Sequence, residues 1–294
     1  MIVSHSFLTR GLETLVTYNP ISVHEDVTLD ELLERLYSTG FHHWPVVDDQ
    51  QHIIGMISDQ DIVRAATERH IANAPQDECR KNYKVRVSNF MKRHVQMIDD
   101  SASPLDALSR IIEQGIHCLP VTKAGALWGM VTTTDFIREL AYSSHVVRDV
   151  AIQEVYDADP ELVEIDTPIE EVRKLFIAGG LSYVLVIQGD CPLGVITARD
   201  LRRHCCRQMA RTLFDGKLGE TCTAIDLLKT TSCLQRTSDL GSAATTMYEQ
   251  QINAVMVCPR GEEYFGVITE EQILNRVCNV ELAAAHKETV GTSY

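Results

Sequence analysis

The stretch Gly55-Met-Ile-Ser58-Asp-Gln-Asp61 decides how this chain is interpreted, because a motif of the same form occurs four times. The motif is a glycine, two apolar residues, a hydroxyl residue, two variable residues and an acid. The other copies are Gly129-Met-Val-Thr132-Thr-Thr-Asp135, Gly194-Val-Ile-Thr197-Ala-Arg-Asp200 and Gly266-Val-Ile-Thr269-Glu-Glu-Gln272. Successive glycines are 74, 65 and 72 residues apart. Self-similarity at a nearly even period predicts a protein built from four repeats.

The residues around each motif repeat as well. Apolar residues at helical spacing predict a helix before the motif, in the first repeat through Leu29, Leu32, Leu33 and Leu36. An apolar strand such as Tyr183-Val-Leu-Val-Ile187 follows, then a polar turn such as Asp48-Asp-Gln-Gln51. A second strand runs into the motif, a helix follows it, and a short leading strand precedes the first helix. Each repeat is therefore predicted to be strand–helix–strand–strand–helix, an α/β fold.

Hydroxyl residues mark where the first helix of each repeat is expected to begin: Thr28, Ser103, Thr167 and Ser238. The first three have an acid three residues later, the spacing of a reciprocal helix cap. Pro104 and Pro168 follow two of these hydroxyls, at a position where a helix tolerates a missing N–H.

These motifs resemble the cystathionine-β-synthase (CBS) domain family, over nearly the whole chain from about residue 12 to 280. The resemblance implies four CBS repeats paired head to tail into two Bateman modules. The first module is expected at 12–142, with repeats 12–68 and 87–142, and the second at 147–280, with repeats 147–206 and 218–280. It also implies that two modules stack into a flat disc, either within one chain or in a homodimer.

The resemblance further implies two clefts per module for adenosine-containing ligands, namely AMP, ADP, ATP or S-adenosylmethionine. The chemistry of the motif suits them. Each hydroxyl stands where a strand meets a helix and can bond a phosphate near the free N–H groups: Ser58, Thr132, Thr197 and Thr269. An acid one turn later can accept the two hydroxyls of a ribose: Asp61, Asp135 and Asp200. Glycine would let a ligand ring approach the strand closely: Gly55, Gly129 and Gly194.

The same hydroxyl–acid spacing has a simpler explanation, since a helix capping box needs no ligand. The two interpretations are compatible, because a capping residue can also contact a ligand. The fourth repeat departs from the pattern, because Gln272 replaces the acid and its opening, Lys229-Thr-Thr-Ser-Cys233, lacks the proline of Asn19-Pro20. We expect its cleft to be empty or to have a different specificity.

Three further residues are predicted to contact the ligand. Ile21 belongs to an opening that is similar to the family pattern, and Arg199 inside the third motif offers positive charge for a phosphate. His117, like His42 and His43, stands where some relatives, including the gamma subunit of AMP-activated protein kinase, place phosphate-contacting residues. The alternative for these histidines is ordinary packing beside a strand.

The composition limits the possible partners. The net charge of −14 disfavours binding to nucleic acid or to an anionic membrane. No apolar stretch approaches the ~18 residues of a transmembrane helix, and the N-terminus does not resemble a signal peptide. Nine cysteines, an odd number without a C-x-x-C pair, predict reduced thiols and a cytoplasmic location.

No catalytic motif is found in the sequence, so no catalytic or metal-binding residues are predicted. With all repeats assigned, no residues are expected to remain for an enzyme domain. The favoured hypothesis is a non-catalytic sensor whose nucleotide changes the arrangement of the modules, a change read by a separate effector protein. The alternatives are a structural adaptor with degenerate clefts and, with least support, a nucleotide hydrolase.

Overall fold

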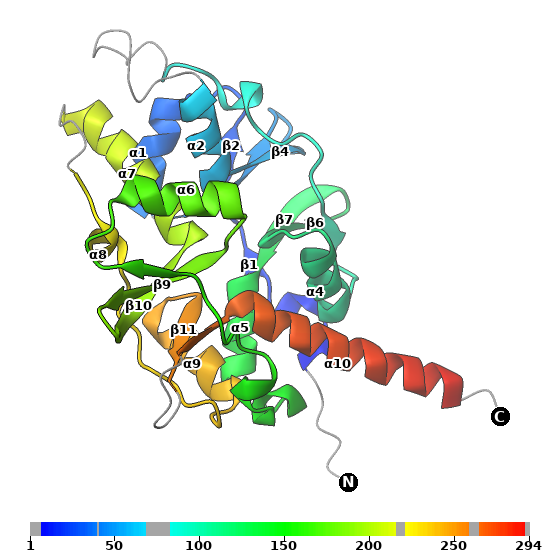
Figure 1. Ribbon diagram of the computed structural model, residues 1–294. Helices are drawn as coiled ribbons and strands as arrows, with labels where there is room; N and C mark the ends of the chain where they lie inside the picture. Colours follow the sequence, from blue (N-terminus) through cyan, green and yellow to red (C-terminus); the bar gives the residue numbers. More distant parts are fainter. Residues whose placement is uncertain (1–6, 40, 69–82, 216–220, 259–264, 292–294) are drawn as a thin grey trace.

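The computed structural model describes residues 7–39, 41–68, 83–215, 221–258 and 265–291 (Figure 1). The predicted start of the fourth repeat, residues 218–220, lies outside this part. Repeat one consists of β2 (Val23–His24), α1 (Leu29–Thr39), β3 (His43–Val47), β4 (Ile53–Ser58) and α2 (Asp59–Glu68). Repeat two consists of β5 (Ile98–Asp99), α4 (Pro104–Glu113), β6 (Cys118–Lys123), β7 (Ala126–Thr132) and α5 (Thr133–Tyr142).

The second half of the chain follows the same order. Repeat three consists of β8 (Leu162–Glu164), α6 (Ile169–Gly179), β9 (Tyr183–Gln188), β10 (Cys191–Thr197) and α7 (Ala198–Asp215). Repeat four consists of α9 (Leu240–Gln250), β11 (Ala254–Val257), β12 (Gly266–Thr269) and α10 (Glu270–Gly291), and its leading strand is reduced to a parallel bridge between Leu234 and Val257. The predicted α/β repeat is confirmed.

The four sheets have one topology. In repeats one to three the leading strand pairs parallel with the second strand, and the third strand is antiparallel to the second. The motif hydroxyl lies opposite the first residue of the preceding strand in every repeat: Ser58 opposite His43, Thr132 opposite Cys118, Thr197 opposite Tyr183, and Thr269 opposite Ala254. Four equivalent strand-to-helix junctions result.

Two of the predicted helix starts need correction. Ser103 caps α4 in a reciprocal box with Asp106, as predicted, and Pro104 is the first helical residue. Pro168, in contrast, precedes α6 instead of beginning it. The cap of α9 is Asp239 and not Ser238: its carboxylate accepts the N–H of Ser242 at 2.6 Å. A carboxylate interacts better than a hydroxyl with the positive end of the helix dipole, which favours the acid.

Within each module the repeats exchange the segments that precede their leading strands. One residue of each segment pairs with the last strand of the other repeat: Thr17 with Met130, Lys92 with Met56, Asp157 with Val267, and Lys229 with Val195. We call Thr17, Lys92, Asp157 and Lys229 the crossing residues. Thr17 belongs to β1 (Thr17–Tyr18), which joins the sheet of repeat two beside β7.

The crossing segments explain the motif glycines. A side chain at Gly194 would clash with the carbonyl oxygen of Lys229, and one at Gly266 with that of Asp157. A side chain at Gly129 would strike Val16, and one at Gly55 would strike Met91. The space beside each glycine is therefore filled by the protein itself. The predicted reason for glycine here, the approach of a ligand ring, is replaced by the close approach of two protein segments.

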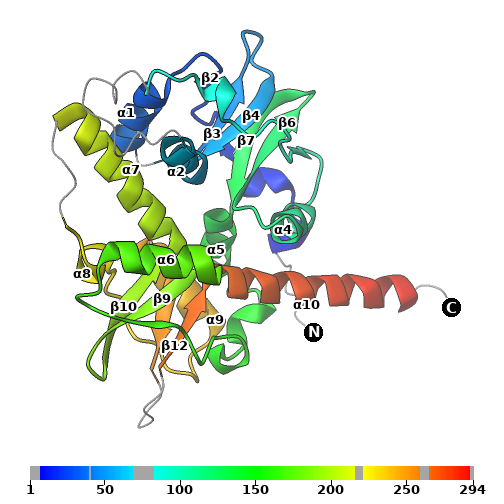
Figure 2. The ribbon, with the colours of Figure 1, turned by 45° about the horizontal axis from the view of Figure 1, so that its top comes forward.

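The repeats form a closed ring around a common centre. The sheets of repeats three and four pack face to face through an apolar cluster that contains Leu185, Val195, Ala254, Met256 and Val267. Helices α5 and α9, and helices α4 and α10, join repeats two and four in the largest core. Repeat one packs α1 and α2 against α7 of repeat three (Figure 2). The two modules thus pack against each other within one chain.

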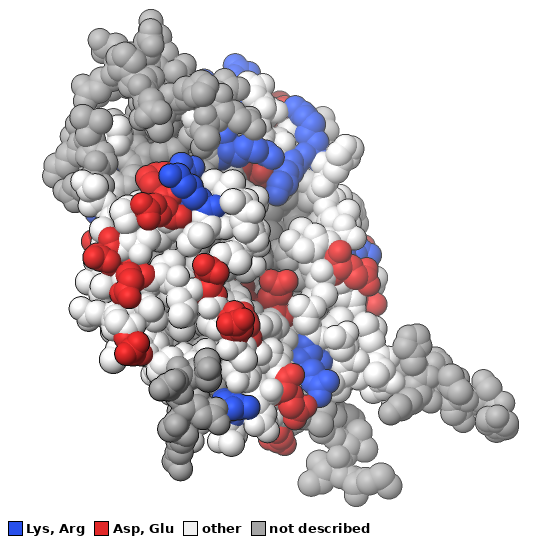
Figure 3. Space-filling view, viewed as in Figure 1, with Lys and Arg blue, Asp and Glu red and all other residues white. Residues whose placement is uncertain are grey.

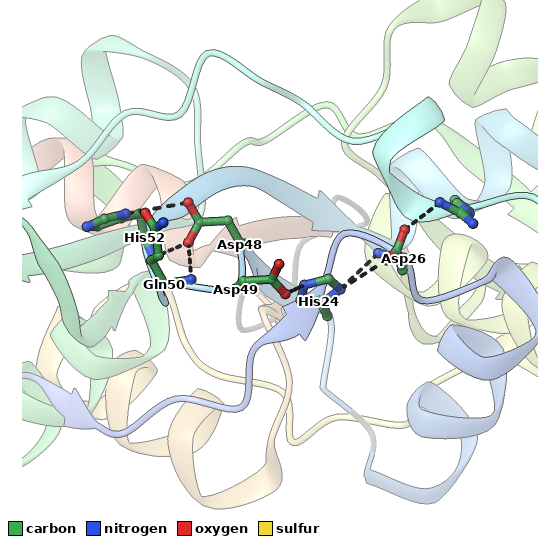
Figure 4. A network of polar contacts seen from close by, with 7 residues as sticks. His24, Asp26, Asp48, Asp49, Gln50 and His52 are labelled. Atoms are coloured by element: carbon green, nitrogen blue, oxygen red, sulfur yellow. Dashed lines mark hydrogen bonds and ion pairs between the residues drawn. The ribbon is translucent and has the colours of Figure 1, made fainter.

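A polar network closes the turn between β3 and β4 in repeat one (Figure 4). The carboxylate of Asp48 accepts the N–H groups of Gln50 and His52, each at 2.9 Å. Beside it, His24 Nε2 lies 3.0 Å from Asp49 Oδ1. This network confirms the polar turn expected at 48–51, and none of its labelled residues lines the cavities described below.

The prediction of reduced thiols is wrong for one pair. Cys233 and Cys258 form a disulfide with their Cα atoms 5.8 Å apart. They are 25 residues apart in sequence and become neighbours because Leu234 pairs with Val257. Among the described residues, five further cysteines are free thiols: Cys118, Cys191, Cys205, Cys206 and Cys278. In the part of the chain that is described, no helix is long and apolar enough to cross a membrane.

Candidate functional site

All four motif hydroxyls take part in helix caps. Ser58 Oγ donates to Asp61 at 2.6 Å, Thr132 Oγ1 to Asp135 at 2.7 Å, and Thr197 Oγ1 to Asp200 at 2.6 Å. Thr269 Oγ1 donates to Gln272 at 3.2 Å, so an amide oxygen serves equally as the cap of α10. The capping interpretation therefore holds in every repeat. The clefts of repeats one to three differ instead in what the second carboxylate oxygen of the motif acid contacts and in how much space surrounds it.

In repeats one to three the second carboxylate oxygen of the motif acid lies beside a cationic side chain. Arg138 donates to Asp135 Oδ1 at 3.0 Å from one turn further along α5. Arg64 does the same to Asp61, and the crossing residue Lys92 lies 3.8 Å from the same oxygen. In repeat three the crossing residue Lys229 reaches Asp200 Oδ1 at 2.6 Å. A lysine from the neighbouring repeat therefore approaches the motif acid in two clefts.

The largest of three cavities, about 440 Å³, lies between repeat two and the opening of repeat one, and we call it the repeat-two cavity. It brings together five of the predicted ligand residues: Ile21, His117, Thr132, Asp135 and Arg199. Part of its lining is apolar: Pro20, Ile21, Phe41 and Met130. Another part is rich in side-chain nitrogen atoms: His42, His43, His117 and Arg199. This volume and this mixed lining are typical of a small-molecule site.

Two further cavities contain other predicted residues. The repeat-one cavity, about 180 Å³, is lined by Ser58 and Asp61 together with Lys92 and His94. The module-two cavity, about 340 Å³, is lined by both Thr197 and Thr269 and by Gln272. Of the predicted residues, Asp200 and the three glycines line none of these three cavities: Gly55, Gly129 and Gly194.

The cavities meet at the centre of the ring. His117 lines all three, and Arg199 lines the repeat-two and module-two cavities. Arg199 Nη2 is 2.7 Å from Glu270 Oε1 at the start of α10. Arg202, one turn later on α7, donates to Asp59 at the start of α2 at 3.1 Å. Repeat three is therefore linked by ion pairs to both repeat one and repeat four.

Sequence reasoning missed these two acids. Asp59 and Glu270 occupy the same motif position, directly after the hydroxyl, and repeats two and three have Thr133 and Ala198 there. The signal was present: an alignment of the four motifs shows an acid in this column only in repeats one and four. Thr133 Oγ1 also donates to Glu270 at 3.1 Å, so three of the four repeats meet at this carboxylate.

The central histidines are neutral at physiological pH. Burial, reinforced by nearby arginines, lowers the pKa of His42 to about 3 and that of His43 to about 3. Burial also lowers the pKa of His117, and Arg199 contributes in the same direction. A neutral imidazole still donates one N–H to an anion. Positive charge at the centre therefore comes from the arginines of α7.

The free energy of unfolding should fall as the pH decreases from about 6.5 toward 3. The unfolded chain binds protons at these histidines below about 6.5, whereas the folded protein resists protonation until its much lower pKa. Urea denaturation at pH 7.5, 6.5 and 5.5 measures this dependence. The variant His43→Gln removes one such group, so its stability should fall less steeply. Equal slopes for both proteins would show that His43 is not held neutral by the fold.

A family model described as the CBS domain matches residues 12–68, 87–142 and 147–206. The chain belongs to the CBS domain family. The family model does not match the fourth repeat, which is assigned from the structure. Like the other repeats, it has a strand-to-helix junction, a last strand paired with a crossing residue, and a capped motif.

Several known proteins and solved structures are similar to this chain. MJ1225 from Methanocaldococcus jannaschii is 21% identical over 208 residues, 67% of this chain and 70% of that protein. Its crystal structure, described as a proposed archaeal homologue of γ-AMPK, covers 91% of this chain and 100% of its own at TM-score 0.71 and 17% identity. A Pyrococcus horikoshii structure covers 92% of this chain and 100% of its own, with TM-score 0.61 and 17% identity. A CBS domain-containing protein from Dictyostelium discoideum is 29% identical over 127 residues, 43% of this chain and 88% of that protein.

Proposed function

We propose that this protein is a non-catalytic sensor that binds an adenosine-containing ligand in the repeat-two cavity. The observation that carries the proposal is the composition of this cavity. Apolar walls, a motif carboxylate and a group of histidine and arginine side chains surround one space of about 440 Å³. These three features match the base, the ribose and the phosphate of a nucleotide. The family resemblance, with its clefts for AMP, ADP, ATP or S-adenosylmethionine, supports the same class.

The lining indicates how such a ligand would lie. The adenine would contact Ile21 and Met130, where the walls are apolar. The ribose hydroxyls would donate to Asp135 Oδ1, which accepts only Arg138 among the described hydrogen bonds, whereas Oδ2 already accepts the N–H and the hydroxyl of Thr132. The phosphate would face Arg199 and the first turn of α5, where the N–H groups and the helix dipole attract anions.

The same geometry supports signalling. Arg199 forms an ion pair with Glu270, and the phosphate of a bound nucleotide would compete for its guanidinium. A ligand that binds more tightly when this pair is open would change how repeat four is held against repeat three. We propose that a separate effector protein reads this change. The modules at 12–142 and 147–280, a homodimer of this chain and a cytoplasmic location belong to the same proposal.

Nucleic acid and membranes are not among the proposed partners. The chain carries a net charge of −14, which repels phosphate backbones and anionic lipids. On one face, basic side chains are most numerous toward the top of the view, and acidic side chains are spread over most of the face (Figure 3). A single nucleotide in a cavity lined locally by Arg199 and histidines does not meet this repulsion.

Isothermal titration with AMP, ADP, ATP and S-adenosylmethionine tests the proposal. We expect saturable binding of at least one of them, and a gain in the free energy of unfolding of about 2.7 kcal/mol at 100 times its dissociation constant. The absence of heat from all four, together with an unchanged melting temperature, would favour the structural adaptor instead. That alternative is supported by the caps, because one side-chain oxygen at the last motif position of every repeat is already bonded at its own helix start without any ligand.

A further inference from the structure

We propose that Lys229 occupies the cleft of repeat three in place of a ligand, so that Asp200 does not bind a ribose in the native protein. This inference rests on the proposed function and deepens it, because it assigns the clefts unequal roles. It is based on the identity of the crossing residues. The acid of the motif is present in repeats one to three. The crossing residue that faces it is Lys92 in repeat one, Thr17 in repeat two and Lys229 in repeat three.

The crossing position faces the cleft. Thr17, the crossing residue opposite Asp135, lines the repeat-two cavity together with that acid. Lys92, the crossing residue opposite Asp61, likewise lines the repeat-one cavity. Lys229 pairs with Val195 in the same way that Lys92 pairs with Met56, one residue beyond the motif glycine. Its side chain therefore extends from the position that forms the wall of the other two clefts.

The contact between Lys229 and Asp200 is close and largely buried. Nζ lies 2.6 Å from Oδ1, and the side chains are 31% and 7% exposed. In repeat one the corresponding distance is 3.8 Å, and Lys92 is 53% exposed. Arg138 donates to Asp135 from one turn along α5. Arg203 stands at the equivalent position of α7, three residues after Asp200, but no bond joins it to Asp200 within the described hydrogen bonds. In repeat three, Lys229 therefore contacts Oδ1 of the motif acid, the oxygen that accepts the helix arginine in repeat two.

The motif acid lines a cavity in two of the three clefts. Asp135, opposite a threonine, lines the cavity of about 440 Å³, and Asp61, opposite the more distant lysine, lines that of about 180 Å³. The repeat-three motif reaches the module-two cavity of about 340 Å³ through Thr197, but neither Asp200 nor Lys229 lines it. To bind Asp200, a ribose would have to displace the ammonium group of Lys229 from a buried carboxylate. This displacement is unfavourable because it breaks an ion pair that is largely shielded from water.

The segment that carries Lys229 is fixed at its other end. Leu234 exchanges backbone hydrogen bonds with β11, donating to Met256 at 2.9 Å and accepting from Cys258 at 2.7 Å. The disulfide between Cys233 and Cys258 joins the same two strands. With β10 paired to Lys229 and β11 paired to Leu234, the lysine is held over Asp200 between two fixed points.

A reciprocal exchange of crossing residues tests the inference. The probe is AMP, and the measurement is the number of nucleotides bound per chain, by isothermal titration and native mass spectrometry. Lys229→Thr copies the residue of the repeat-two cleft and should bind one nucleotide more than the unmodified protein. Adding Asp200→Asn to this variant should remove the extra nucleotide. Thr17→Lys, at an exposed position, should bind one nucleotide fewer.

The outcomes separate the two proposals. Lys174→Thr, an exposed lysine on α6, is the matched control and should bind as the unmodified protein does. Unchanged stoichiometry in Lys229→Thr, with the nucleotide of the unmodified protein retained, would overturn the inference and leave the proposed function intact. So would loss of a nucleotide when Asp200→Asn is made in the unmodified protein. An unmodified protein that binds no nucleotide at all would instead overturn the proposed function.

Discussion

Replacing Asp135 with asparagine is expected to weaken nucleotide binding by about tenfold to a hundredfold while leaving the fold intact. Hydrogen bonds to a charged acceptor contribute about 1.5–3 kcal/mol, and the ribose hydroxyls would lose that acceptor. The carboxylate is largely buried, and burial raises its pKa despite the opposing bonds from Thr132 and Arg138. The fold should tolerate the amide, because repeat four already caps α10 with Gln272 through the same bonds.

Isothermal titration measures this effect, and Asp106→Asn is the matched control. Asp106 caps α4 with Ser103 in the same type of box but lines none of the three cavities. The control should therefore bind nucleotide as the unmodified protein does. Equal affinities for Asp135→Asn and the unmodified protein would mean that Asp135 is only a helix cap and that the ribose lies elsewhere.

Replacing Glu270 with leucine is expected to lower the free energy of unfolding by about 3 kcal/mol. This change leaves Arg199 with an uncompensated charge in a largely buried position, and breaking such pairs costs roughly 3–5 kcal/mol. The side chains of Arg199 and Glu270 are 19% and 9% exposed, so solvent screens the pair little. Leucine also removes the acceptor of Thr133.

A double-mutant cycle with Arg199→Met distinguishes this coupling from a simple loss of packing. Because both charges are then absent, the double variant should be more stable than the sum of the single changes predicts. The surface pair between Arg276 and Glu154, with side chains 39% and 52% exposed, provides the control. Glu154→Leu should cost at most about 1 kcal/mol. Strict additivity of Arg199→Met and Glu270→Leu in urea denaturation would show that the pair does not couple the repeats.

The local structure could be predicted from the sequence because it depends on short-range patterns. The motif Gly-apolar-apolar-hydroxyl places a strand end and a helix start within seven residues, and all four junctions form there. The reciprocal bonds between Ser58 and Asp61, or between Thr132 and Asp135, follow from spacing alone. The departure at Gln272 was also visible, and its amide takes over the cap.

The long-range contacts could not be predicted in this way. No period in the sequence shows that Lys229 crosses β10 or that Thr17 crosses β7, because these pairs join segments that belong to different repeats. For this reason the sequence alone points to a ligand beside the motif glycines, whereas the structure has a crossing segment there. The disulfide of Cys233 with Cys258 depends on the same pairing of distant segments.

A crystal structure of the protein, grown with the nucleotide that binds it most tightly in titration, would show directly whether the repeat-two cavity is the binding site. We expect the adenine beside Ile21, the ribose on Asp135 and the phosphate facing His117 and Arg199. We also expect Lys229 to remain beside Asp200 in the same crystal. A repeat-two cavity without the nucleotide, or the nucleotide bound only in another cleft, would show that the site is wrongly assigned.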